Sequence, residues 1–170
     1  ASYQPLGLIF WQLALGVLLL SVITRLQGTP VPMSWAHIRF YAMVALTGTI
    51  IPNTFSYIVA VHIPAGLLAI SIATVPMFSL IIALVIKSER FNSLRMLGIV
   101  LGALAIALIL GPEADFSSQG IGLFMLLALI APFFYAIEGN YLALKTPANM
   151  PPLTILYGAS IIGLVICTPL

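Results

Sequence analysis

The chain has 170 residues, of which 62% are hydrophobic and only 6% are charged, and its net charge is +2. Soluble domains carry about 25% charged residues, because their surfaces face water. Soluble folds, disordered chains and electrostatic nucleic-acid binders are therefore excluded. The single cysteine, Cys167, rules out an intrachain disulfide framework and a cysteine-based zinc site, and no cofactor is expected. The composition predicts an integral membrane protein.

Six apolar stretches follow one another along the chain, and each approaches the roughly 20 residues that span a bilayer as a helix. They cover Pro5–Ile23, Ile38–Val61, Ala65–Ile86, Met96–Leu110, Ile121–Leu144 and Leu153–Leu170. None alternates polar and apolar residues or has a continuous polar face, which excludes membrane strands and surface helices. The sequence predicts an all-α, polytopic membrane protein with six transmembrane helices. Because the chain begins without Met and ends just as a span ends, we expect it to be part of a longer sequence.

The basic residues indicate how these spans are oriented. All six lie in or beside the first, third and fifth connections, and they are Arg25, Arg39, Lys87, Arg90, Arg95 and Lys145. Successive connections alternate between the two sides of a membrane, so these three share one side, which the positive-inside rule places in the cytoplasm. We expect a multi-pass protein of the cytoplasmic (inner) membrane, with its basic loops cytoplasmic.

Glu138 is the only acidic residue inside a predicted span. An ionised side chain at the middle of a membrane helix costs about 2.5–3.5 kcal/mol, so it should face protein or water instead of lipid. A helical wheel places Tyr135 on the same side of the helix. One interpretation is a site that couples protons or binds an amine of a substrate. The other is a structural role, in which Glu138 pairs with a neighbouring helix or reaches the cytoplasmic surface.

Polar residues gather around a proline in the second span. Pro52 lacks a backbone N–H and should kink the helix, which frees a carbonyl near Gly48. Such irregular backbone is tolerated where it lines a cavity or packs on protein. Asn53 and Tyr57, four residues apart, would present hydrogen-bonding groups to a solute, or would bond to another helix. The third span repeats the pattern with Ser71, Thr74 and Pro76, and the fifth with Pro132.

Small residues mark a second kind of helix face. Gly98 and Gly102 form a GxxxG pattern, which is typical of close helix packing, and the alternative is a homodimer interface. Gly158-Ala159-Ser160 begins like a hydrolase nucleophile motif, but position 162 is Ile and no histidine lies at a matching depth. The two histidines lie on opposite sides of the membrane, so they cannot share a metal ion. We therefore expect that the chain is not an enzyme and holds no metal.

Several segments together resemble the EamA-like branch of the drug/metabolite transporter superfamily. The first is Pro64–Pro76, followed by Ser88-Glu89-Arg90 and then by the glycine-containing run Gly98–Gly102. They are similar to the family's proline-containing fourth helix, its Glu-Arg pair and its glycine-rich fifth helix. Gly120–Gly122 and Ala131–Ala136 look like the opening helix of the family's second repeat.

The resemblance implies a ten-helix secondary active transporter built from two inverted repeats. By this resemblance residues 1–113 are an incomplete first repeat, with family helices two to five, and residues 114–170 begin the second, with helices one and two. The family implies alternating access and an exporter that carries small molecules, namely metabolites, amino acids or drugs, across the cytoplasmic membrane. A basic residue often found early in the second family helix is absent, and Trp11-Gln12 occupies that region.

The resemblance also implies that the second, third and fifth spans border a central cavity. The residues expected to contact substrate there are Asn53, Tyr57, Ser71, Thr74, Tyr135 and Glu138, with Glu138 as the ionisable group. The alternative is a non-transporting membrane subunit or scaffold that packs through Gly98 and Gly102. In a scaffold Glu138 should be paired with a cation, whereas a transporter should leave it facing a polar cleft.

Overall fold

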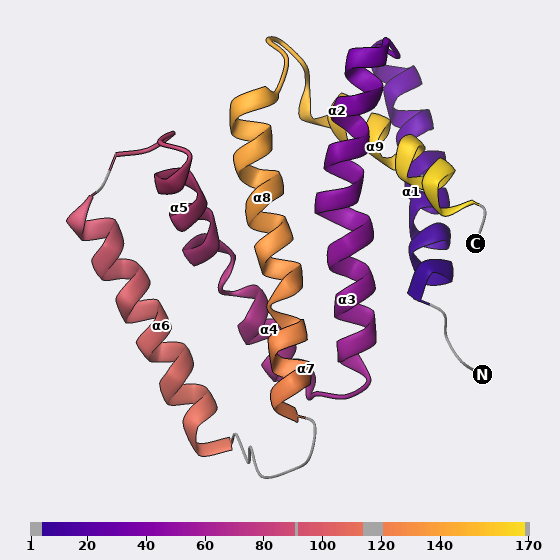
Figure 1. The fold of residues 1–170 in the computed structure, drawn as a ribbon. Helices are drawn as coiled ribbons and strands as arrows, with labels where there is room; N and C mark the ends of the chain where they lie inside the picture. The colour runs from indigo at the N-terminus through magenta and orange to yellow at the C-terminus, as the bar shows by residue number, and fades with distance from the viewer. Residues whose placement is uncertain (1–4, 91, 114–120, 169–170) are drawn as a thin grey trace. The chain divides into compact units, whose positions relative to one another are not determined.

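The structure is a computed structural model that describes residues 5–90, 92–113 and 121–168, and this part of the chain is entirely helical (Figure 1). The elements are α1 (Pro5–Gln27), α2 (Trp35–Ala45), the π-helix η1 (Leu46–Ile50), α3 (Ile51–Ala60), α4 (Ala65–Ile72), α5 (Val75–Val85), α6 (Ser93–Glu113), α7 (Ile121–Ala128), α8 (Ile130–Lys145) and α9 (Pro152–Cys167).

Helices occupy all six stretches for which the sequence predicts spans. Four of them are long and apolar enough to cross a membrane, and they are Pro5–Gln27, Trp35–Ala60, Ala65–Val85 and Gly122–Lys145. The other two stretches contain shorter apolar helices, Ser93–Ala105 and Pro152–Cys167, within the residues described. The helical, multi-pass architecture expected from composition is therefore confirmed, with four helices that qualify as candidate spans by length and composition.

Several helices extend further than their apolar stretches predict, because polar residues stabilise the ends. α1 continues past Ile23 to Gln27 and closes at Gly28, whose φ of +63° suits a residue without a side chain. The N–H groups of Gly28 and Thr29 bond to the carbonyls of Arg25 and Thr24, which is the Schellman pattern of a helix end. Arg25 is therefore part of the helix, where the sequence had suggested a connection.

The start of α6 differs from the sequence prediction for a similar reason. The Asn92 side chain accepts a hydrogen bond of 2.9 Å from the N–H of Leu94 and so caps the helix at Ser93. The predicted start was Met96, so Arg95 also lies inside a helix. At the other end α6 continues to Glu113, past the predicted end at Leu110.

Each mid-span proline coincides with an irregularity one helical turn upstream. Because proline lacks an N–H, the α-helical bond to the carbonyl four residues earlier is missing. These carbonyls belong to Gly48 before Pro52, Ile72 before Pro76 and Ala128 before Pro132. Around Gly48 the chain forms η1, in which the N–H of Ile51 bonds to the carbonyl of Leu46, five residues earlier. α4 ends at Ile72 and α7 ends at Ala128, and in both places a short turn precedes the next helix. The irregularity predicted near Gly48 is thus a π-helical turn.

The chain forms two compact units, each described by itself. Unit 1 comprises Ala1–Thr54 and Tyr141–Leu170, and unit 2 comprises Phe55–Asn140. In unit 1, α9 packs on α1 and α2, and the fully buried Tyr41 is part of the hydrophobic core. The Tyr41 ring lies against Gly158, and Leu13 and Ala45 lie against Gly163. The small residues of α9 therefore allow this close packing, which the sequence analysis did not predict.

Unit 2 has a smaller core in which Val59 and Ile63 lie against Ala128 of α7. The His62 ring stacks on Phe124, with 3.9 Å between the ring centroids. Of the two glycines predicted to pack, Gly102 lies against the end of the Met77 side chain of α5, while a side chain at Gly98 would meet open space. Gly102 thus contributes to packing within the unit, and the homodimer interface stays a prediction.

We expect Gly158→Ala to lower the free energy of unfolding of the chain by about 1–3 kcal/mol, the usual result of overpacking a core. A Cβ atom at this position would lie 2.5 Å from Cζ of Tyr41, so the ring would have to move. Gly98→Ala is the matched control, and it should stay within about 1 kcal/mol of the parent. The measurement is denaturant unfolding in detergent micelles. Equal stabilities for the two variants would show that the contact between α9 and Tyr41 is wrong.

Candidate functional site

Three of the predicted substrate contacts come together in unit 2. Tyr135 and Glu138 lie on successive turns of α8, and Tyr57 lies on α3. The Tyr135 side chain interacts electrostatically with both Glu138 and Tyr57. All three side chains are partly buried, neither enclosed in a core nor fully exposed. Together they combine one carboxyl group with two phenol rings, a set that suits a solute with a cationic or hydrogen-bonding group.

The Glu138 carboxyl group is not neutralised by the cations of its own unit. Unit 2 contains Lys87, Arg90 and Arg95, and the ion pair found among its described residues joins Arg95 to Glu89. A carboxylate inside a membrane helix without a cationic partner is costly, so it favours protonation, water or a bound cation.

The remaining predicted contacts lie on α3 and at the break between α4 and α5. Asn53 lies one helical turn before Tyr57 on α3 and thus on the same face of that helix. The Ser71 hydroxyl donates to the Leu68 carbonyl at 2.7 Å, and the Thr74 hydroxyl donates to the Ser71 carbonyl at 2.6 Å. Both hydroxyls help to satisfy the irregular backbone before Pro76. Each keeps lone pairs with which it can accept a hydrogen bond from a solute.

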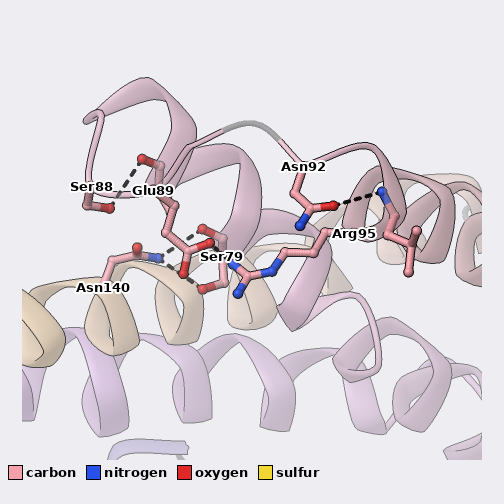
Figure 2. A network of polar contacts seen from close by, with 8 residues as sticks. Ser79, Ser88, Glu89, Asn92, Arg95 and Asn140 are labelled. Atoms are coloured by element: carbon pink, nitrogen blue, oxygen red, sulfur yellow. Dashed lines mark hydrogen bonds and ion pairs between the residues drawn. The ribbon is translucent and has the colours of Figure 1, made fainter.

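Asn140 is a polar anchor that the sequence analysis missed. Its side-chain amide nitrogen lies 3.0 Å from the Ser79 hydroxyl oxygen, 3.1 Å from the Ser79 carbonyl oxygen and 2.9 Å from the Ala136 carbonyl oxygen (Figure 2). These bonds link α8 to α5 inside unit 2. Asn140 is two residues after Glu138 and therefore lies on another face of α8. The sequence analysis considered only the face of the helix that carries Glu138, so it did not include Asn140.

An ion pair closes the connection between α5 and α6. Figure 2 shows the side chains of Glu89 and Arg95 pointing toward each other. The connection begins with Lys87, whose φ of +57° places a residue with a side chain in the conformation that usually favours glycine. Both members of the pair are solvent-exposed, so it contributes little to stability.

Among the described residues, no cluster of three or more His, Cys, Asp or Glu side chains could hold a metal ion. Asp115 lies outside the described residues. The groups that Tyr57, Tyr135 and Glu138 bring to unit 2 are two phenols and one carboxyl group.

The sequence model of the EamA-like transporter family matches residues 1–111. No curated protein and no solved structure matches the chain. The family match covers the resembling segments from Pro64 to Gly102, while Gly120–Gly122 and Ala131–Ala136 lie outside it. The chain belongs to the EamA-like transporter family and is a multi-pass membrane protein of the drug/metabolite transporter type.

Proposed function

We propose that the protein is a secondary active transporter that exports small metabolites, amino acids or drugs across the cytoplasmic membrane. In this proposal residues 1–113 belong to a first repeat and residues 114–170 begin a second, inverted repeat of a ten-helix carrier. The basic connections face the cytoplasm. Substrate access alternates between the two sides as the repeats move against each other, which is the mechanism typical of inverted-repeat carriers.

One observation carries the proposal: Glu138 lies within a span, no ion pair joins it to a cation among the described residues of its unit, and its charge acts on Tyr135, which also lies near Tyr57. Such a carboxyl group can take up a proton on one side of the membrane and release it on the other, or it can exchange that proton for a cationic substrate. The phenol groups beside it would hold the solute while the carboxyl group changes its charge.

The irregular helices support the same mechanism. η1 and the turns before α5 and α8 interrupt three spans near their middle. Helices broken inside a membrane are tolerated where they pack on protein or line a water-filled cavity. They also supply positions at which φ and ψ change without disrupting a long run of hydrogen bonds. A scaffold that packs through Gly98 and Gly102 would not need these breaks.

Glu138→Gln is expected to abolish transport driven by a pH gradient, because the amide has nearly the same shape but cannot exchange a proton. The measurement is substrate flux in proteoliposomes that contain the complete gene product, with and without an imposed pH gradient. Glu89→Gln is the matched control, since it removes an exposed carboxylate outside the spans and should keep transport. Normal gradient-driven flux in Glu138→Gln would rule out proton coupling through this residue.

Tyr57→Phe and Tyr135→Phe should each raise KM about two- to tenfold with little change in expression, because one hydrogen bond contributes about 0.5–1.5 kcal/mol. The ring remains, so packing is preserved. Tyr141→Phe is the control: it lies on α8 but its ring stacks on Phe40 in unit 1, with centroids 5.6 Å apart. The same KM in all three variants and the parent would show that the two phenol hydroxyls do not contact substrate.

A further inference from the structure

Unit 1 has an uncompensated positive charge at one end. Its two segments contain three cations, Arg25, Arg39 and Lys145, and no acidic residue. Arg25 and Arg39 lie beside the connection between α1 and α2, and Lys145 precedes the connection between α8 and α9. Both connections line the same cavity, so they lie at the same end of the unit. This end therefore attracts anions, and within a membrane protein it lies beside lipid headgroups.

The shared cavity has a volume of about 440 Å³, within the range of pockets that hold small molecules. Most of its wall is apolar and comes from Val31, Met150 and several prolines, including Pro30 and Pro151. Prolines have no N–H group, so this wall offers few hydrogen-bond donors to a bound molecule. The cavity is suited to an apolar chain segment with a polar group at one end.

Thr154 supplies the polar group of this cavity. Its residue surface is 1% exposed, and its hydroxyl has no hydrogen-bond partner among the described residues. Other hydroxyls on the helices of unit 1, such as those of Thr24, Thr47 and Ser160, donate to a carbonyl of their own helix. A buried hydroxyl without a partner is costly, and Thr154 lines this cavity, so an acceptor that enters the cavity would remove this cost once the hydroxyl turns toward it.

A second cavity adjoins the first and contains the cation. Its volume is about 410 Å³, and it shares Thr29 and Val31 with the first cavity. Arg25 and Tyr157 also line it, so one cationic residue and one residue with a phenol group border the same space. Guanidinium groups bind phosphate oxygens through two parallel hydrogen bonds. Arg39 and Lys145 line neither cavity.

We propose that these two cavities form a binding site for one anionic phospholipid. The phosphate binds to Arg25 in the second cavity, and an ester or glycerol oxygen accepts the hydrogen bond of Thr154 in the first. The upper part of an acyl chain lies against Val31, Met150 and the prolines. The proposal uses only unit 1 and depends on neither Glu138 nor transport, so each can fail without the other.

The test is native mass spectrometry of the complete protein in mixed detergent micelles, titrated with phosphatidylglycerol or phosphatidylcholine. We expect the parent to retain one phosphatidylglycerol molecule at concentrations at which phosphatidylcholine is lost. Arg25→Gln should weaken this retention about tenfold or more, as expected for a lost charge-assisted bond. Arg39→Gln removes the same charge at the same end and is the matched control, with a change of about twofold at most.

Thr154→Val tests the hydroxyl contact with little change in volume. Without lipid this variant should be more stable than the parent, because it removes an unpartnered hydroxyl, and it should retain phosphatidylglycerol several-fold less well. A third arm adds glycerol 3-phosphate, which should not displace the lipid, because it lacks the acyl chain.

Three results would overturn the proposal. Equal retention of the two lipids in the parent would show an apolar cavity without headgroup recognition, and this result does not depend on the folding of any variant. Equal losses in Arg25→Gln and Arg39→Gln would indicate general attraction by charge. Displacement of the lipid by glycerol 3-phosphate would identify a site for soluble phosphates instead.

Discussion

The missing N–H groups of three prolines determine how the membrane helices of this protein are built. In lipid no water replaces a lost backbone bond, so each free carbonyl has to find a partner within the protein. The chain forms a π-helical turn before Pro52, and a helix ends before Pro76 and before Pro132. Hydroxyls of Ser71 and Thr74 bond to the backbone at one of these breaks. The same interruptions give long spans a place to bend, which a carrier needs and a rigid scaffold does not.

Packing within each unit combines an apolar core with a few small or polar residues at which helices approach closely or bond. Lipid is as apolar as leucine, so apolar contact by itself does not hold membrane helices together. In unit 1 the absence of a side chain at Gly158 lets α9 approach the buried Tyr41 ring closely. In unit 2 Asn140 bonds to Ser79 and joins α8 to α5. These contacts fix the neighbours of α8 and thereby the surroundings of Glu138, which lies on another face of that helix.

Charge is arranged differently in the two units, and this difference separates the two proposals. Unit 2 contains a carboxyl group inside a span without a cationic partner from its own unit, next to phenols, while its exposed carboxylate Glu89 is paired. Unit 1 has three cations and no acid, together with cavities that contain Arg25 and the unpartnered hydroxyl of Thr154. The first arrangement suits a solute or proton that enters and leaves. The second suits a lipid that stays bound at the membrane surface.

The sequence by itself determined the class, the helical segments and the family, because apolar length, charge placement and proline position are local properties of the chain. It also identified Glu138 as the unusual group, since an acid within an apolar run is visible without a structure. Helix ends such as Gly28 and Asn92 required hydrogen bonds that the apolar pattern does not contain. Only the tertiary structure paired Asn140 with Ser79 and placed Tyr57 near Tyr135, because these residues are 61 and 78 positions apart and meet only through packing between helices. Only the tertiary structure, likewise, left the Thr154 hydroxyl without a partner among the described residues.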